Sequence, residues 1–221
     1  DFGIFAQMYE YMKQKGTIST TVERNKLLSH FAVHFSPIFY IALPIYFIFD
    51  NAITVQLIQA FMVAIPVIPI LLLCKHHKLS NQMAIAVSLI YVLYPATAGG
   101  TFYDIHENCF ITFFLLMLAW AVEKKKNVAA VIFAILSLMV KEDAPVYVFI
   151  LGIFFLFSKK DKKRGVILIV ASAIYFAMAT AIVNSYGLGI QEYRFGNLYF
   201  TQDGGLIQVF ETLLANPGYA I

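Results

Sequence analysis

The chain has 221 residues, of which 60% are hydrophobic, 16% aromatic and only 13% charged. A soluble domain usually has about 45–50% apolar and about 25% charged residues, so this composition indicates an integral membrane protein. The net charge of +3 comes from short basic clusters that lack interleaved aromatic residues, which excludes a nucleic-acid partner. The two cysteines, Cys74 and Cys109, have no CxxC spacing and fall on opposite membrane faces in the topology below, which argues against a disulfide.

Residues 1–52 are expected to form a loop on the outer face of the membrane. Apolar side chains recur at helical spacing over Asp1–Met12, which predicts a helix lying in the interface; they are Phe2, Phe5, Met8, Tyr9 and Met12. Ser36–Phe49 is apolar but short and contains Pro37 and Pro44. An interfacial or re-entrant helix is favoured there over a seventh crossing, which would move the basic clusters to the outside.

Six apolar stretches within residues 53–183 predict an all-α, polytopic transmembrane helix bundle, because one crossing takes roughly 20 apolar residues. Pro66 and Pro69 should kink the first. Short loops rich in Lys and Arg stay cytoplasmic, and three clusters hold ten of the sixteen Lys+Arg residues: Lys75–Lys78, Lys124–Lys126 and Lys159–Arg164. The expected spans are Ile53–Leu73, Gln82–Thr97, Ile105–Val122, Val128–Val140, Ala144–Phe157 and Gly165–Val183.

This orientation predicts a multi-pass protein of the plasma membrane whose chemically equipped face is extracytoplasmic. Residues 184–221 then form a second outer loop. The abrupt ends of the sequence lead us to expect a piece of a longer protein, with an upstream span before Asp1.

The turn Lys141-Glu142-Asp143 joins two short predicted spans. A helix over Val128–Val140 reaches only about 20 Å, against a hydrocarbon core of about 30 Å, so the turn should be recessed. Charges at that depth normally face a water-filled cavity or one another, and we expect a cavity shared with Asp1, Asp104 and His106. The alternative is a tight polar turn in which Lys141 pairs with a carboxylate and caps the helices.

Asp104, His106 and Glu107 follow a flexible glycine-containing segment. Such residues can bind a divalent metal, hold a phosphate or act in acid–base chemistry. Their spacing matches no strong metal signature, so a metal requirement stays open. The alternative is a helix start in which Asp104 and Glu107 form a capping-box-like pair. Arg194, in the second outer loop, is a fixed cation that suits phosphate binding. His34 lies just before Ser36–Phe49, where a lone histidine is more often a surface residue than a ligand.

Four motifs carry a resemblance to known proteins: Asp1-Phe2-Gly3-Ile4-Phe5, His34-Phe35-Ser36-Pro37, Tyr103-Asp104-Ile105-His106-Glu107 and Val140-Lys141-Glu142-Asp143. With them the chain resembles a family of uncharacterised bacterial and archaeal multi-pass membrane proteins. That family is similar to the GT-C superfamily of lipid-phosphate-dependent glycosyltransferases, which includes the protein O-mannosyltransferases and the lipid A aminoarabinose transferase. Many GT-C enzymes have an acidic pair in the first outer loop, whereas here Phe2 follows Asp1.

The resemblance implies a GT-C-like bundle and a glycosyltransferase that moves a sugar from a polyprenyl-phosphate donor to an acceptor on the outer face. Asp1 would be the general base that deprotonates the acceptor. The candidates for the donor phosphate would be Lys141, Arg194, His34 and His106. Acceptor or metal would be oriented by Asp104, Glu107, Glu142 and Asp143.

Two other function classes remain open on the sequence. An ion-coupled transporter or permease could use Lys141–Asp143 as a buried charged site. Transporter sites usually lie near the membrane midplane at broken helices, whereas these polar groups gather on one face. A structural membrane module without chemistry is the third reading.

Overall fold

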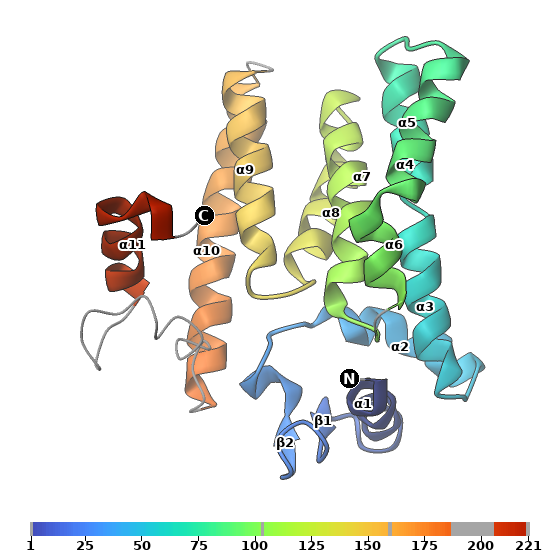
Figure 1. Ribbon diagram of the computed structural model, residues 1–221, viewed down its shortest axis with the longest axis vertical. Coiled ribbons are helices and arrows are strands. Elements are labelled where there is room, and N and C mark those ends of the chain that lie inside the picture. The colour runs from blue at the N-terminus through green and yellow to red at the C-terminus, as the bar shows by residue number, and fades with distance from the viewer. Residues whose placement is uncertain (1, 103, 159–160, 187–205, 220–221) are drawn as a thin grey trace.

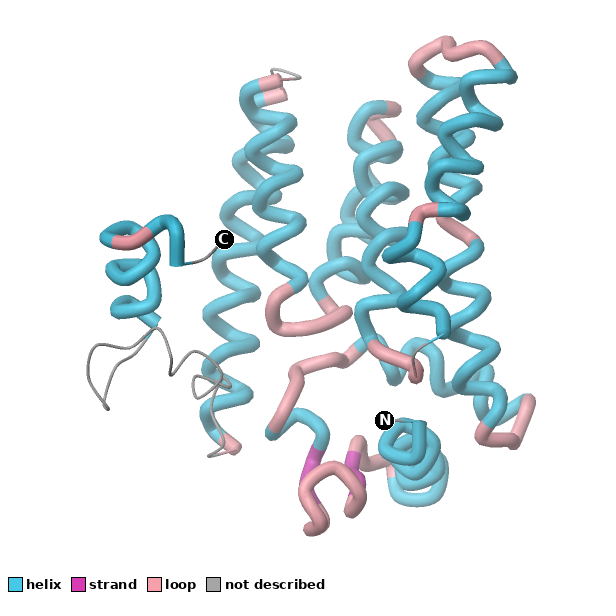
Figure 2. Tube along the Cα trace, in the orientation of Figure 1, coloured by secondary structure: helices cyan, strands magenta, loops and turns pink. Residues whose placement is uncertain are grey.

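A computed structural model describes residues 2–102, 104–158, 161–186 and 206–219. This part of the chain is predominantly helical, and most of its helices run between two ends of the molecule (Figure 1). Loops fall mainly at those ends (Figure 2). The helices and 3₁₀ turns that build the bundle and its lower layer are α1 (Phe2–Lys15), η1 (His30–Ala32), α2 (Ile38–Ile48), α3 (Ile53–Ala64), α4 (Val67–His76), α5 (Asn81–Leu93), α6 (Pro95–Phe102), η2 (Glu107–Phe110), α7 (Ile111–Glu123), α8 (Asn127–Leu138), α9 (Ala144–Phe157) and α10 (Lys162–Ser185).

Helices occur at each of the six stretches predicted to span the membrane. Prolines divide the first two of them. The first stretch breaks between α3 and α4 at Pro66, whereas Pro69 lies within the first turn of α4, where a missing N–H is tolerated. The second breaks at Tyr94, whose extended conformation (φ −62°, ψ 124°) is the one favoured before Pro95.

The basic turns lie together at one end of the bundle, drawn at the top of Figure 1. His77 after α4 lies 2.8 Å from Glu123 at the end of α7. Arg164 in α10 donates a 2.8 Å hydrogen bond to Asn127 at the start of α8. The turns α4–α5, α7–α8 and α9–α10 therefore share one face, which we call the basic end.

The opposite end carries a layer made of α1, α2 and a short antiparallel hairpin (Figure 1). The hairpin strands are β1 (Ser19–Thr20) and β2 (Leu28–Ser29), with Ser19 opposite Ser29. The predicted apolar face of α1 is confirmed, because Phe5, Met8, Tyr9 and Met12 are buried. They pack in one core with α2 and α3. The sequence did not predict the hairpin, whose strands are only two residues long.

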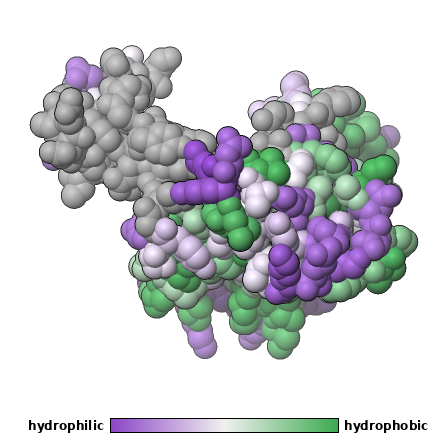
Figure 3. All heavy atoms as spheres, turned by 90° about the horizontal axis from the view of Figure 1, so that it is seen from below, coloured by the Kyte–Doolittle hydropathy of each residue, from purple (hydrophilic) through white to green (hydrophobic). Residues whose placement is uncertain are grey.

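Viewed from this end, hydrophilic residues are prominent on the visible surface, with apolar residues among them and around the margin (Figure 3). The layer therefore presents a mixed face away from the bundle. Helix α2, which covers most of Ser36–Phe49, lies in this layer. Its interfacial or re-entrant placement stays a prediction.

Two glycines allow the backbones of α9 and α10 to pack closely against each other. A Cβ atom on Gly165 would lie 2.8 Å from the Gly152 carbonyl oxygen and 2.8 Å from the Leu156 nitrogen, and one on Gly152 would lie 2.9 Å from Ile169. Real Cβ atoms do not approach other atoms so closely. The two backbones can therefore touch only because both positions are glycine.

Two helical stretches among the described residues are long and apolar enough to cross a membrane, Ile53–His76 and Lys162–Ser185. Only 33% and 22% of their most apolar windows are buried inside the molecule. Side chains such as Leu93 (72% exposed) and Ile174 (65% exposed) cover the outside of the bundle. Exposed apolar surface on this scale marks a surface that contacts lipid or protein.

Candidate functional site

A polar pocket of about 470 Å³ opens at the end of the bundle opposite the basic end. It lies between α3, α5, α6 and the segment that leads into α7. Hydroxyl, amide, imidazole and carboxylate groups line it, in contrast to the apolar outside of the helices. These polar lining residues are Gln59, Tyr91, Tyr94, Thr97, Asp104, His106, Asn108 and Thr112.

The backbone of residues 104–106 decides which side chains face the pocket. The predicted span from Ile105 begins later than expected, because residues 104–106 are not helical, His106 is extended and the 3₁₀ turn η2 starts only at Glu107. Asp104 and His106 line the pocket, whereas Ile105 and Glu107 are buried at 0% and 1% exposure.

Two hydrogen bonds hold this segment. The Phe2 amide donates to the Asp104 carboxylate at 2.9 Å, which ties the start of α1 to the pocket rim. The His106 amide donates to the Gln59 side-chain oxygen at 3.0 Å, which ties the segment to α3. The expected capping-box pair is not formed, since Asp104 binds α1 and no side chain caps η2 at His106.

Glu107 points away from the pocket and pairs with Lys141. The two atoms Glu107 Oε1 and Lys141 Nζ are 2.9 Å apart. Burial raises the pKa of the Glu107 carboxyl, but the charges of Lys141, His34 and His30 outweigh that effect and the pKa lies below its ordinary value. Burial likewise lowers the pKa of Lys141, and Glu107 more than reverses it. Both groups are therefore held in their charged forms.

Glu142 binds the segment between η1 and α2. One of its oxygens lies 2.8 Å from His34 Nδ1, and the other accepts a 2.9 Å hydrogen bond from the Phe35 amide. Burial raises the pKa of Glu142, and the hydrogen bond and charge of His34 bring it below the ordinary value. Lys141 and Glu142 therefore clamp the turn before α9 to two different segments.

His30 forms a second, more buried contact beside His34. This residue is 1% exposed, and its Nδ1 lies 3.3 Å from Glu23 in the hairpin loop. The rings of His30 and His34 meet edge to face at 5.9 Å, and Phe5 packs against both His30 and His106. The two histidines therefore meet inside an aromatic cluster.

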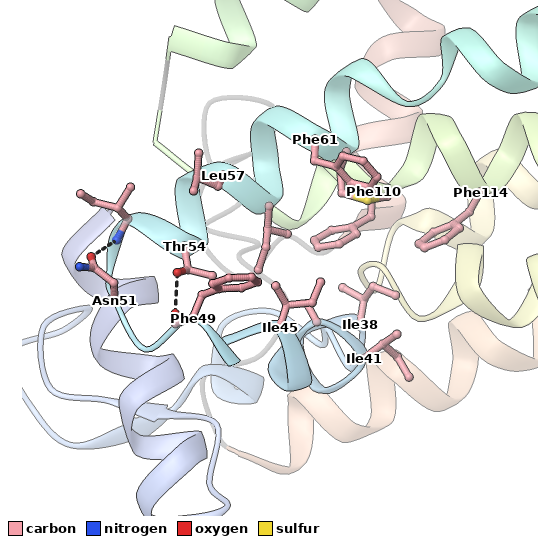
Figure 4. Close-up of a pocket in the computed structure, with 14 residues that line it drawn as sticks. Ile38, Ile41, Ile45, Phe49, Asn51, Thr54, Leu57, Phe61, Phe110 and Phe114 are labelled. Carbon is pink, nitrogen blue, oxygen red and sulfur yellow. Dashed lines mark hydrogen bonds between the residues drawn. The ribbon is translucent and has the colours of Figure 1, made fainter. Parts of the chain in front are cut away.

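An apolar groove of about 570 Å³ lies between α2 and α3 (Figure 4). The residues of α3 that line it differ from those that line the polar pocket. Ile38, Ile41 and Ile45 of α2 face Leu57 and Phe61 of α3 across it (Figure 4). Phe110 of η2 and Phe114 of α7 close its inner end. Since Asn108 and Cys109 of η2 line the pocket, α3 and η2 form a wall common to the pocket and the groove.

The predicted site residues thus fall into separate groups. Asp104 and His106 line the polar pocket; Glu107, Lys141, Glu142 and His34 form ion pairs beside it; Asp143 is exposed. The Lys141–Asp143 turn does not line the pocket that holds Asp104 and His106. Asp1 and Arg194 lie outside the described residues. Within those residues no group of three or more His, Cys, Asp or Glu side chains is arranged to hold a metal.

Several pocket residues escaped the sequence analysis. Gln59 had a usable signal, because a buried amide within an otherwise apolar span needs a partner. Tyr91 and Tyr94, near the end of α5, and Asn108 and Thr112, after His106, had no comparable signal. Their role depends on how α5 and α7 meet, which no local pattern reveals.

One protein family matches almost the whole chain. Residues 1–218 match the family described as "Predicted membrane protein (DUF2079)". The chain belongs to this family. No curated protein and no solved structure matches it. The description of the DUF2079 family agrees with the two helical stretches long and apolar enough to cross a membrane, so the chain is a membrane protein.

Proposed function

We propose that the protein is a GT-C-like glycosyltransferase that moves a sugar from a polyprenyl-phosphate donor to an acceptor hydroxyl at the outer face of a multi-pass bundle. The observation that carries the proposal is the polar pocket and the apolar groove on the two sides of one wall, α3 and η2. A polyprenyl-phosphate sugar has the same division into a polar head and an apolar chain.

The pocket offers groups suited to a sugar phosphate. Hydroxyls and amides from Gln59, Thr97 and Asn108 suit a carbohydrate, and Tyr94 adds an aromatic ring. His106 is the proposed contact for the donor phosphate, because Lys141 and His34 are engaged by carboxylates. Arg194 remains a second proposed phosphate ligand. Asp104, bound to the Phe2 amide, would help to position the start of α1.

Asp1 is the proposed general base, and the bond between the Phe2 amide and Asp104 supports its assignment to the pocket. In the proposed step the Asp1 carboxylate takes the proton of the acceptor hydroxyl. The acceptor oxygen then bonds to the anomeric carbon as the bond from that carbon to the phosphate oxygen breaks. The electron pair leaves with the polyprenyl phosphate, whose charge His106 would stabilise in its protonated form.

The test is transfer by the purified protein in lipid. Polyprenyl-phosphate sugars with a labelled sugar are supplied together with a membrane extract as acceptor, and released polyprenyl phosphate is measured. We expect release that depends on both the protein and the acceptor, and that falls in the His106→Gln variant. Asp50→Asn is the matched polar control, because Asp50 is exposed and outside the pocket. Absence of release across a panel of sugars would contradict the proposal.

The buried Glu107–Lys141 pair favours one other candidate, an ion-coupled transporter. That function would use Lys141–Asp143 rather than the pocket. Uptake of a solute driven by a proton gradient in sealed vesicles, abolished by Glu107→Gln and indifferent to His106→Gln, would identify it. Transfer of label to an acceptor would identify the glycosyltransferase.

A further inference from the structure

A second groove, of about 440 Å³, runs between α8 and α10 next to the basic end. Small side chains hollow it out: Ala130 and Ala134 from α8 and Ala171 from α10. Its floor is formed by Val122, Leu138 and Leu168, which are buried. Val131, Ile135 and Ile167 form exposed apolar walls. The groove is thus open on the lipid-facing side of the bundle.

The groove ends in positive charge. Lys163 and Arg164 line it at the start of α10, next to Asn127. Arg164 is held by Asp161 at 2.6 Å and by Asn127 at 2.8 Å, while Lys163 is exposed. Most of the neighbouring charged residues in the described part of the chain are basic, namely Lys124, Lys125, Lys126 and Lys162, whereas Glu123 and Asp161 are acidic.

We propose that this groove binds an anionic phospholipid, with an acyl chain between α8 and α10 and the phosphate at Lys163 and Arg164. The argument is charge complementarity joined to shape. An apolar channel that faces lipid will take any acyl chain, but cations at its mouth favour an anionic head group, and basic pockets between membrane helices bind such head groups. The site lies at the end of the bundle away from the polar pocket and does not depend on the glycosyltransferase proposal.

The test measures which lipid occupies the groove. The single tryptophan, Trp120, is replaced by Phe, and Ile167→Trp puts a reporter on the groove wall, since Ile167 is 54% exposed. The protein is reconstituted in vesicles of phosphatidylcholine with increasing fractions of dibrominated phosphatidylglycerol or dibrominated phosphatidylcholine. Bromine on an acyl chain quenches a tryptophan that it contacts, so quenching reports occupancy by each lipid.

We expect the Ile167→Trp reporter to prefer dibrominated phosphatidylglycerol, by about five-fold for each cation that contacts the phosphate. Lys163→Gln should remove about five-fold of that preference. Lys78→Gln, at an exposed lysine of the basic end outside the groove, should leave it unchanged. A second reporter, Ile174→Trp, exposed farther along α10, should show equal quenching by the two lipids.

Three results would overturn the proposal. Equal quenching of the groove reporter by both lipids would show an unselective surface. An equal preference for phosphatidylglycerol at the Ile174→Trp reporter would show a general attraction of anionic lipid to the basic end. A preference at the groove reporter that Lys78→Gln reduces as much as Lys163→Gln does would show the same. Weak quenching by both lipids at the groove reporter alone would show that a protein segment covers the groove.

Discussion

The ammonium of Lys141 lies 2.9 Å from the Glu107 carboxylate and joins the turn before α9 to the segment before α7. Glu142, next along the chain, holds His34 at 2.8 Å. One polar turn therefore fixes two segments that lie far from it in the sequence. The order of the layer beneath the bundle depends on these charges.

Removing one partner of the Lys141–Glu107 pair should destabilise the protein strongly. Lys141→Met leaves the Glu107 carboxylate, which is only 1% exposed, without its counter-ion. Breaking a buried pair in this way lowers the free energy of unfolding by about 3–5 kcal/mol. The double variant Lys141→Met/Glu107→Leu should recover most of that loss, because no buried charge remains. Reversible unfolding in detergent micelles measures both. Lys13→Met, which removes the exposed pair with Asp50, should change little; a double variant as unstable as the single one would contradict this account.

Acid should weaken the same region. The pKa values of Glu107 and Glu142 lie below the ordinary value of 4.5 in the folded protein. Because the pKa values of these two carboxyl groups are lower in the folded protein, the stability that the ionised carboxylates provide is fully present above pH 4.5. That stability is lost as the pH falls through the pKa values of the folded protein. When the melting temperature is measured from neutral pH downwards, it should therefore fall once the pH is below 4.5. Glu142→Gln should melt lower at neutral pH and lose part of the acid-dependent decrease.

Gly165→Ala should separate α9 from α10. Its methyl group would meet the Gly152 carbonyl oxygen at 2.8 Å, and overpacking of this kind costs typically 1–3 kcal/mol, so we expect a loss of about that size. Gly3→Ala is the matched control, since nothing lies within 4 Å of the position that its Cβ would take. In helix α1 that control should be neutral or stabilising, because alanine is the better helix former. Equal effects of the two substitutions would show that the close approach is not maintained in the membrane.

Thiol labelling of intact cells tests the orientation. With Cys74 and Cys109 replaced by serine, Lys125→Cys at the basic end should resist a membrane-impermeant reagent, because basic loops stay cytoplasmic. Asn51→Cys, in the exposed turn between α2 and α3 at the opposite end, should react. The reverse labelling pattern would move the polar pocket to the cytoplasmic side. Labelling of both in opened cells checks that both thiols are reactive.

Replacing the proposed base should abolish transfer. An amide cannot accept the acceptor's proton, and loss of a general base typically lowers the rate by about 10²–10⁴-fold. Asp1→Asn should therefore remove turnover while melting temperature stays near that of the unmodified protein. Asp50→Asn, the same change at an exposed position, should keep full activity. Unchanged turnover in Asp1→Asn would take the role of base away from this residue.

Sequence patterns predicted the parts of the fold that depend on neighbouring residues. Apolar runs located the helices, a kink was predicted at Pro66, where the first stretch breaks, and the apolar face of α1 followed from its spacing. The basic clusters gathered at one end, as alternating helices require. Patterns of this kind could not predict that Lys141 would pair with Glu107 rather than with an adjacent carboxylate, because that pairing depends on how the turn between α8 and α9 meets η2.

The same limit applies to the pocket. The sequence singled out Asp104, His106 and Glu107 as one group of candidate ligands, because they lie within four residues of one another. Hydrogen bonds from Phe2 and to Gln59, which come from distant elements, hold Asp104 and His106 ahead of the helical residues instead. That difference in backbone separates Glu107 from the other two. Whether the pocket binds a sugar phosphate stays a prediction.

The pocket side of residues 104–107 can change chemically in a way that the core side cannot, because Asp104 and His106 line the pocket and Ile105 and Glu107 are buried. His106 is anchored through its backbone amide, so its side chain can be exchanged without releasing the segment from Gln59. Ile105 and Glu107, buried on the other side, cannot vary in the same way. A substitution at position 106 would therefore change the chemistry of the pocket while the hydrogen bond to Gln59 keeps the segment in place, and a designer who wishes to retune the pocket would begin with that imidazole.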